Sequence, residues 1–443
     1  MRAVMKYTYL QALGWIVLYV LFVLSPFLLI LAGPLQEGRG FWIEFGSALG
    51  FIGMSMLCAQ FLLTGRFRVL AQGFGSDNLL HFHTGTGIAA MCMVFAHPII
   101  LLIVHADFRS YLDPSVNLPR VLALIPAMIA VFLVVVLSLW RKACRLSYEL
   151  WRVSHGLLSV FVVCIGLVHL LQVSHHSSLW WQKGGMILFT VVSVGAIIEV
   201  RVIRPRRMKK YAYKLVEVHP ERSQATTLIV EADGHEGMKL KAGQYAWMTV
   251  GKSPYALQQN PFSFSSPESS PKRLEFTAKP AGDFTSTWSE MTPGTPVFLD
   301  GPYGAFTLND HSNRGSIFFA GGVGITPIMS MLRTLAERED KRPCILFYGS
   351  RTWEEVLFQE ELEALKQSLN LRVIHVLSAP TEAWDGDTGY LTHEIMEREL
   401  PENLKDFDYY ICGPEPMMDL VERELGTKPI PLRQILSERF QIV

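Results

Sequence analysis

The hydrophobic and polar positions divide this chain into two halves near residue 205. The first half contains six long stretches without Asp, Glu, Lys or Arg, at residues 7–36, 45–65, 78–106, 121–140, 153–182 and 184–198. Five of them have at least twenty residues, which is enough to cross a bilayer as a helix. The sixth is shorter, but Trp180 and Trp181 precede it, and such aromatic residues are typical of membrane interfaces. We therefore predict six membrane-spanning helices.

The second half follows a basic segment that ends at Lys210, and its apolar residues occur in short runs. Runs bounded by Gly, Pro and Ser predict a small antiparallel β-barrel with strands at 212–218, 225–232, 245–250, 273–279 and 296–299. Further along, strands at 316–320, 344–349, 372–377 and 409–412 alternate with helices at 327–338, 354–368 and 416–425. This alternation predicts a doubly wound parallel sheet with a ligand crevice at the carboxyl ends of its strands. We expect a multidomain protein with a transmembrane helical domain at 1–207, the barrel at 208–310 and the α/β domain at 311–443.

Basic residues gather in alternate loops of the apolar half, which predicts the orientation of the chain in the membrane. They precede the first helix and follow the second, fourth and sixth: Arg2, Lys6, Arg66, Arg68, Arg141, Lys142, Arg145, Arg201, Arg204, Arg206, Arg207, Lys209 and Lys210. The other loops have no comparable excess, and positive charge favours the cytoplasmic side. Both termini are therefore expected in the cytoplasm, and we expect a multi-pass protein of a bacterial inner (cell) membrane.

Four histidines in the apolar half form two pairs with the same spacing, His83 with His97 and His155 with His169. Fourteen residues are close to four turns of a helix, so the members of each pair share one face about 21 Å apart. The third and fifth helices run in the same direction, which sets His83 level with His155 and His97 level with His169. Facing histidines at two depths are a ligand set for two bis-histidine haems. One such histidine alone could instead be a packing residue.

The remaining histidines of this half do not repeat the interval: His81, His105, His175 and His176. Lys and Arg balance Asp and Glu at 40 each, so no nucleic-acid partner is indicated. The six cysteines form no CxxC pair, which argues against an iron–sulfur site and against a disulfide framework. Candidate chemistry therefore lies in the paired histidines and in the second half of the chain.

A glycine-rich turn lies directly between the predicted strand at 316–320 and the helix that follows. Its glycines, Gly321, Gly322 and Gly324, allow backbone amides to approach a pyrophosphate. Thr326 can cap the helix, and Pro327 suits the first helical turn because no amide donor is lost there. The turn therefore predicts nucleotide binding, although a proline stands where a standard dinucleotide fingerprint has its third glycine.

Together with the histidine pairs, these motifs resemble the NADPH oxidase and ferric reductase superfamily. The likeness covers nearly the whole chain and is to a prokaryotic membrane flavocytochrome b with ferredoxin-reductase-type FAD and NAD(P) domains. It implies FAD contacts at Gln244, Tyr245, Pro261, Phe262, Ser263, Phe264, Ser265, Lys279, Gly282, Phe284, Thr285, Gly301, Pro302 and Gly304. It implies nicotinamide-coenzyme contacts at Gly321, Gly322, Gly324, Thr326, Pro327, Cys412, Gly413 and Pro414. The four paired histidines are then the ligands of two b-type haems.

Phe440 is similar in position to the aromatic residue that covers the flavin ring in this superfamily, and the resemblance places Phe440 and Cys412 among the catalytic residues. Two departures stand out. Many membrane members have His before the Pro-Phe-Ser motif, where this chain has Asn260, and members often end at the terminal aromatic, whereas three residues follow Phe440. The 2′-phosphate that distinguishes NADPH from NADH would lie near Ser350 and Arg351. A charge-assisted contact from Arg351 to this phosphate would favour NADPH.

These parts imply one electron route across the membrane. Nicotinamide gives up two electrons as a hydride, haem iron accepts one at a time, and flavin converts between them. The expected order is NAD(P)H, FAD, the haem of His83 and His155, the haem of His97 and His169, and an external acceptor. Short outer loops favour a small acceptor, O2 giving superoxide. The alternatives are a ferric or other metal reductase on the same route, and an ion transporter or channel with a flavin sensor. The sequence identifies no regulatory partner.

Overall fold

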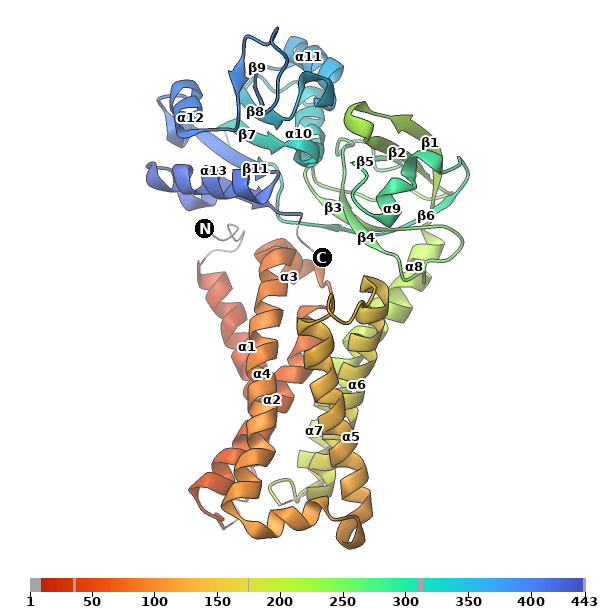
Figure 1. Ribbon diagram of the computed structural model, residues 1–443, viewed down its shortest axis with the longest axis vertical. Helices are drawn as coiled ribbons and strands as arrows, with labels where there is room; N and C mark the ends of the chain where they lie inside the picture. The colour runs from red at the N-terminus through yellow and green to blue at the C-terminus, as the bar shows by residue number, and fades with distance from the viewer. Residues whose placement is uncertain (1–8, 35–36, 174, 310–313, 441–443) are drawn as a thin grey trace. The chain divides into compact units, whose positions relative to one another are not determined.

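The structure, a computed structural model, describes residues 9–34, 37–173, 175–309 and 314–440 (Figure 1). The chain folds into two compact units, which are described separately below. Among the described residues, the helical unit comprises those of 9–67 and of Leu79–Ile203. The second unit comprises Arg68–Asn78 and Arg204–Val443, and contains both β-sheets.

Six helices of the described residues are long and apolar enough to cross a membrane, as the sequence predicts. They are α1 (Tyr9–Leu31), α2 (Phe41–Leu63), α4 (Ser76–Val104), α5 (Pro114–Leu139), α6 (Tyr148–Val173) and α7 (Trp180–Ile198). The histidine pairs lie on α4 and α6, one member near each end of the helix.

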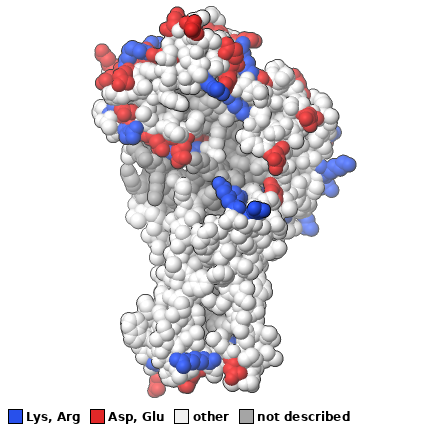
Figure 2. Space-filling model, in the orientation of Figure 1, with Lys and Arg blue, Asp and Glu red and all other residues white. Residues whose placement is uncertain are grey.

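The helical unit buries small and polar residues together with part of its apolar residues, and many of its large apolar side chains face outward. Helix α2 is the most buried of the six, with Cys58, Ala59 and Ser55 packed among its neighbours. On other helices large side chains face outward, for example Ile103 at 74% exposure. On the face shown in Figure 2, the side of this unit carries almost no charged side chain. Such an apolar outer surface suits lipid and would be unusual in water.

The ends of the membrane helices differ from the predicted limits for local reasons. Helix α5 begins at Pro114 rather than 121, because the Asp113 side chain caps the amide of Ser115 and proline fits the first turn. Helix α7 continues through a π-turn (Glu199–Ile203) into α8 (Arg204–Lys210). Two short elements were not predicted: α3 (Arg68–Phe74) and a 3₁₀ turn (Ala106–Leu112).

The first sheet of the second unit is antiparallel and has the order β4-β3-β6-β1-β2-β5. Its strands are β1 (Tyr213–Pro220), β2 (Thr226–Ala232), β3 (Tyr245–Val250), β4 (Asn260–Ser263), β5 (Arg273–Ala278) and β6 (Pro296–Tyr303). Strand β4 was not predicted, because it has four residues and contains a proline. An isolated bridge between Phe264 and Phe276 joins the two edges of this sheet. The core centres on Trp288, Phe264 and Phe276.

The second sheet is parallel throughout, with the order β10-β9-β8-β7-β11-β12. The strands are β7 (Gly315–Gly321), β8 (Cys344–Ser350), β9 (Leu371–Leu377), β10 (Asp387–Thr388), β11 (Phe407–Cys412) and β12 (Ile435–Glu438). The helices are α10 (Ile325–Glu337), α11 (Gln359–Ser368), α12 (His393–Glu399) and α13 (Glu415–Thr427). Helices α10 and α11 pack on one face and α12 and α13 on the other (Figure 1). Strands β10 and β12 and helix α12 were not predicted.

The order in which strands are added to this sheet reverses at β7, which lies between β8 and β11. Consecutive strands run outward from β7 to one side, and the later strands β11 and β12 add on the other. In open α/β sheets, ligands bind at such a switch point, beyond the carboxyl ends of the strands. The glycine-rich turn follows β7 and the Cys412–Pro414 segment follows β11, so both lie at this edge.

Candidate functional site

The four paired histidines lie as two facing pairs inside the helical unit. The ring centroids of His83 and His155 are 6.4 Å apart, and those of His97 and His169 are 6.3 Å apart. The rings are steeply inclined, at 71° and 63°. With metal–nitrogen bonds of about 2 Å, two imidazoles on opposite sides of one ion place their centroids roughly 6 Å apart. Both pairs therefore have the spacing of a bis-histidine metal site.

Hydrogen bonds orient one ring in each pair. Nδ1 of His97 donates to the carbonyl oxygen of Gly46 on α2, at 2.8 Å. Nδ1 of His155 lies 3.0 Å from Oγ of Ser138 on α5. In both cases the engaged nitrogen is Nδ1, which leaves Nε2 free to bind a metal, the arrangement usual for metal-ligating histidines. The residues present therefore fit a bis-histidine haem at each level.

The other ring of each pair has a different environment. Nδ1 of His83 and Nδ1 of His169 are buried and have no hydrogen-bond partner among the described residues. A buried polar atom without a partner is costly, so such atoms often mark a functional site. Gly50 adds a steric feature beside His97, because a Cβ there would lie 2.9 Å from Nδ1 of that histidine. Sequence reasoning did not identify Gly46, Gly50 or Ser138.

Arg120 is a further residue that sequence reasoning missed. It lies on α5, stacks over the Tyr111 ring at 4.0 Å and is within electrostatic range of His169. Its Nε is buried with no hydrogen-bond partner among the described residues. An arginine in an otherwise uncharged membrane helix was the available signal, because such residues are functional by default.

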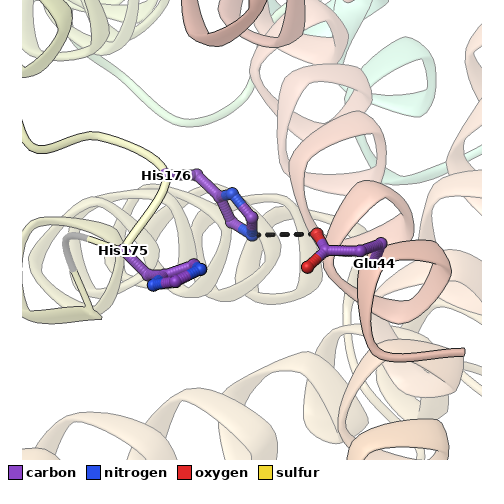
Figure 3. Close-up of side chains that lie close together, drawn as sticks. All are labelled: Glu44, His175 and His176. Carbon is purple, nitrogen blue, oxygen red and sulfur yellow. Dashed lines mark ion pairs between the residues drawn. The ribbon is translucent and has the colours of Figure 1, made fainter. Parts of the chain in front are cut away.

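Glu44, His175 and His176 gather at the same end of the helical unit as His97 (Figure 3). Nε2 of His176 lies 3.2 Å from a carboxylate oxygen of Glu44. Burial lowers the pKa of His176, although the charge of Glu44 opposes this shift. The sequence gave no reason to pair His175 or His176 with Glu44. His105 and Arg109 are exposed, and His105 pairs with Asp107 at 3.5 Å.

The segments implied in FAD binding lie along β3, β4 and β6. The Gln244 amide connects two of them, since its Oε1 accepts from the amide of Lys241 and its Nε2 donates to the carbonyl of Gly304. Gly304 has φ of +104°, and a Cβ there would lie 3.2 Å from the Tyr245 ring. Gly301 also packs closely, with a Cβ position 2.9 Å from Ala246. The loop from Gly301 through Pro302 to Gly304 is thus held tightly against β3.

The Pro261–Ser265 segment forms β4 and the residues after it. Phe262 is partly exposed and packs on Trp288 and Phe284, with centroids at 4.7 and 5.9 Å. Ser263, Phe264 and Ser265 are buried. The carbonyl of Ser265 accepts a hydrogen bond from the Arg333 guanidinium on α10. This segment therefore joins the antiparallel sheet to the nucleotide-binding domain within the second unit.

The Lys279–Thr285 segment is the most exposed of the candidate FAD contacts. Nζ of Lys279 pairs with Glu355 at 3.7 Å. Oγ1 of Thr285 accepts from the amide of Ala281 at 2.8 Å, which closes the turn around Gly282. Phe284 turns inward onto Trp288. Lys279 and the turn residues are thus available to an anionic group.

The glycine-rich turn and the Cys412–Pro414 segment pack backbone against backbone. A Cβ on Gly324 would lie 2.3 Å from the carbonyl oxygen of Cys412, and one on Gly321 would lie 2.5 Å from the Pro414 ring. A Cβ on Gly413 would lie 2.9 Å from the amide of Gly321. Gly322 has positive φ and open space beside it. Glycine is therefore required for close packing at three positions, and at Gly322 it allows a positive φ.

Thr326 and Pro327 are buried in the first turn of α10, where the Thr326 hydroxyl donates to the carbonyl of Val323. Cys412, assigned a catalytic role above, is fully buried in an apolar cluster. Phe440, assigned the second, is 46% exposed. The structure therefore gives Phe440 an accessible ring face and gives the Cys412 thiol a packing environment.

Ser350 ends β8 and Arg351 follows it on the surface. The turn is held by two backbone hydrogen bonds, from Ser378 to the carbonyl of Ser350 and from Ala379 to the carbonyl of Arg351. Arg351 is exposed, while Glu355 is already paired with Lys279. The position therefore remains a candidate for contact with the coenzyme ribose.

Comparison with known families matches both halves of the chain. Residues 49–166 match the family described as ferric reductase like transmembrane component. This range contains three of the paired histidines and ends three residues before His169. Residues 318–423 match the family described as oxidoreductase NAD-binding domain. The chain is thus an integral membrane protein with a nucleotide-binding domain, in agreement with the sequence prediction.

Similar proteins resemble the second half. The reductase component of propane 2-monooxygenase from Mycolicibacterium smegmatis is 30% identical over 45% of this chain and 59% of its own length. NADH–cytochrome b5 reductase 1 from Arabidopsis thaliana is 32% identical over 35% of this chain and 58% of its own length. The ferredoxin reductase in carbazole 1,9a-dioxygenase is similar in structure, with a TM-score of 0.46 and 25% identity over 52% of this chain and 69% of its own. The chain thus spans well under two thirds of the two curated relatives.

Proposed function

We propose that this chain, whose membrane and nucleotide-binding domains have the architecture of the NADPH oxidase and ferric reductase superfamily, carries electrons from cytoplasmic NAD(P)H to an acceptor outside the cell. The route uses FAD and two bis-histidine b-type haems, and the principal acceptor is O2, which gives superoxide. One observation carries the proposal: two histidine pairs, at 6.4 and 6.3 Å, lie at two levels of one apolar helical unit.

The histidines are the residues that would hold the haems. His83 and His155 would hold one haem iron, and His97 and His169 would hold the other. When bound, haem would supply a one-electron carrier at each level. The chain's own contribution is orientation: Gly46 and Ser138 hold Nδ1 of His97 and His155, and so direct Nε2 of each ring to the metal.

The second unit would bind FAD and the coenzyme. FAD, when bound, accepts a hydride and releases electrons singly. Gln244 secures the loop at Gly301–Gly304, and Phe440 offers an aromatic face for the flavin ring. The glycine turn after β7 offers backbone amides to the pyrophosphate of NAD(P)H. The parallel sheet then positions the nicotinamide at its carboxyl edge, the usual place for such a ligand.

The orientation of the helical unit rests on charge. Basic residues gather in the segments after α2, α5 and α7, and few occur in the segments before α2, α5 and α7. By this distribution His83 and His155 lie on the cytoplasmic side, with His97 and His169 on the outer side. Moving one electron outward across an inside-negative membrane releases about 2.3 kcal/mol of free energy per 100 mV. Transfer is therefore outward.

A metal reductase is the second candidate, and one observation favours it. Glu44, His175 and His176 bring three metal-ligating side chains together on the outer side, near His97. Fe(III) reduction to Fe(II) takes one electron, as superoxide formation does, so the same route serves both acceptors. The two candidates differ only in what receives the electron.

The experiment that tests the proposal uses the purified, FAD-supplemented full chain. NAD(P)H-driven oxygen uptake is measured with and without superoxide dismutase, and Fe(III)-chelate reduction is measured without oxygen. Rapid uptake with most electrons recovered as superoxide supports the oxidase. Slow uptake with rapid Fe(III) reduction would favour the metal reductase instead. A purified protein without haem would contradict both candidates.

A further inference from the structure

Three metal-ligating side chains from two distant parts of the sequence meet at one end of the helical unit. Glu44 lies in the first turn of α2, and His175 and His176 lie between α6 and α7. Their ligand atoms all lie within 4.8 Å of one another. Figure 3 shows both imidazole rings on the side of α2 that carries Glu44. Each of the three side chains is partly buried, which limits the conformations they can adopt.

The two histidines differ in what they already bind. Nε2 of His176 lies 3.2 Å from the Glu44 carboxylate and 3.2 Å from the Arg39 guanidinium. Nε2 of His175 is buried and has no hydrogen-bond partner among the described residues. A buried imidazole nitrogen without a partner is costly unless something binds it. The cluster therefore has an unused ligand atom beside a carboxylate and a second imidazole.

The chemistry of the set narrows the ligand to a metal cation. The Glu44 carboxylate attracts cations, and an imidazole nitrogen that accepts is a metal ligand. Two imidazoles and one carboxylate are a usual ligand set for Zn²⁺ and related first-row ions, with bonds near 2.0–2.2 Å. Ligand atoms around such an ion lie about 3.3 Å apart. Nε2 of His176 and the Glu44 carboxylate already have this spacing, at 3.2 Å, and all three ligand atoms lie within 4.8 Å of one another.

We propose that Glu44, His175 and His176 form a binding site for one divalent transition-metal ion. Three protein ligands leave further coordination positions for water or another molecule. Arg39 competes with a metal ion for two of these ligands, because its guanidinium hydrogen-bonds His176 and pairs with Glu44 at 3.7 Å. A metal ion must displace the contact between Arg39 and His176, since two cations cannot share that nitrogen.

The site adjoins one of the proposed haem ligands. Gly46 accepts the hydrogen bond of His97 and lies two residues after Glu44 on the same helix. Two residues are about half a helical turn, so a metal ion on Glu44 would lie close along α2 to the residue that orients His97. Metal binding itself does not depend on the proposed function, but its placement on the outer side does.

The test is Zn(II) binding to the full chain, purified with a non-histidine tag and measured by equilibrium dialysis with elemental analysis. We expect one Zn(II) per chain that is lost or weakened at least tenfold in Glu44→Gln and in His175→Ala/His176→Ala. Two matched controls keep the same binding: His105→Ala removes an exposed histidine of the same unit, and His393→Ala removes one from the exposed cluster with Glu397 and Glu424. Equal Zn(II) binding by wild type and the site variants would overturn the proposal.

Arg39→Ala separates a metal site from an ion-pair cluster that exists only for stability. If Zn(II) competes with Arg39 for His176, the variant binds Zn(II) more tightly, by about tenfold or more. If the cluster is only structural, removal of Arg39 leaves Zn(II) binding absent in the variant as in the wild type. That result would contradict the proposal even where all variants fold normally.

Haem content, measured on the same samples, keeps this inference distinct from the proposed function. Two haems per chain in the Glu44 and His175/His176 variants show that the helical unit is intact. Site-dependent Zn(II) binding by a chain that carries no haem would uphold the metal site and contradict the proposed electron route. Two haems per chain with no site-dependent Zn(II) binding would support the proposed electron route and contradict the metal site.

Discussion

Nδ1 of His97 donates a hydrogen bond to the carbonyl oxygen of Gly46, at 2.8 Å. The two residues lie on different helices, α4 and α2, and the bond fixes which nitrogen of the ring faces its partner His169. A carbonyl can only accept, so Nδ1 must carry the proton and Nε2 is left as the metal ligand. The tautomer of a candidate haem ligand is thus set by a backbone atom.

Gly50→Ala should disturb His97 without removing it. A Cβ at Gly50 would lie 2.9 Å from Nδ1 of His97, so the ring must shift. We expect haem content to fall from two per chain toward one, measured as the pyridine haemochrome. Gly14→Ala is the matched control, because its Cβ meets no atom within 4 Å, and it should keep both haems. Two tightly bound haems in Gly50→Ala would contradict the assignment.

Replacing the paired histidines should separate the two haem levels. His97→Ala or His169→Ala should lose one haem, while NAD(P)H still reduces FAD. His83→Ala or His155→Ala should lose the other haem and abolish electron transfer to the acceptor. Absorbance spectra and haem content of the purified variants measure both effects. Retention of two haems in all four variants would show that the ligands lie elsewhere.

Ser138→Ala tests the hydrogen bond that orients His155, which is 3.0 Å long. Removal of a partner behind a metal-bound histidine typically weakens metal binding about ten- to a hundredfold. We expect haem to leave this variant faster in an apomyoglobin-trap assay, with normal expression. Ser55→Ala is a matched control, since its hydroxyl donates to the carbonyl of Phe51 in the same helix and not to a histidine among the described residues. Equal haem loss in both variants would assign Ser138 a packing role.

Arg120→Gln should lower the reduction potential of the haem on His97 and His169. A nearby positive charge favours the reduced haem, which carries one positive charge fewer. Loss of Arg120 should shift the potential downward by a few tens of mV, and 59 mV corresponds to a tenfold change for one electron. Arg109→Gln removes an exposed arginine of the same side and should leave it unchanged. Spectroelectrochemical titration resolves the two haems.

Arg333→Met should destabilise the second unit. Arg333 bonds Glu361 on α11, Glu275 on β5 and the carbonyl of Ser265. Burial lowers the pKa of Arg333, but Glu361 and Glu275 outweigh it, so the pKa is raised above its ordinary value. Breaking a fully buried pair costs about 3–5 kcal/mol. The loss here should be smaller, about 1–3 kcal/mol, because solvent screens these partly exposed side chains.

The matched control for this prediction is Arg273→Met. Arg273 pairs with Glu231 and Glu217 on an exposed part of the antiparallel sheet. Exposed pairs contribute about 1 kcal/mol or less. Denaturant unfolding followed by protease resistance of the second unit compares the two variants. Equal losses of stability would show that the Arg333 network adds nothing beyond surface charge.

His375 should make the second unit less stable as the pH falls. Burial lowers its pKa to about 4, below the ordinary value of 6.5, and neither ring nitrogen has a partner among the described residues. Between these values the unfolded chain binds a proton that the folded chain does not, so stability decreases on acidification. The loss is complete near pH 4 and amounts to at most about 3 kcal/mol.

The measurement compares wild type with His375→Leu at each pH from 4 to 7. Hydrogen exchange of the β8 and β9 amides is read as a difference between the two proteins, which cancels the intrinsic pH dependence of exchange. Wild type should lose protection relative to the variant as the pH falls, and the difference should be constant above pH 7. A difference that does not change with pH would assign the acid response to other groups.

The amino-acid sequence determined the broad organisation of this protein. Six uncharged stretches were sufficient to predict the membrane helices. A charged side chain in the bilayer costs free energy wherever it occurs, so the absence of charge along a segment identifies it without knowledge of its neighbours. Equal spacing of the histidines on two helices was sufficient to align the pairs, because helical geometry repeats at a known interval. Alternating strands and helices were sufficient to predict the parallel sheet. The hydrophobic pattern of each strand or helix is contained in a few neighbouring residues, and their alternation is typical of an α/β fold.

Only the tertiary structure decided the details that surround these residues. Gly46 and Ser138 beside the histidines, Arg333 between two carboxylates, and Glu44 beside His175 and His176 all involve contacts between segments distant in sequence. Strand β4 was missed for the same reason, since four residues with a proline become a strand only when β3 lies alongside. Packing brings such groups together, and no local periodicity records which distant residue a side chain will meet.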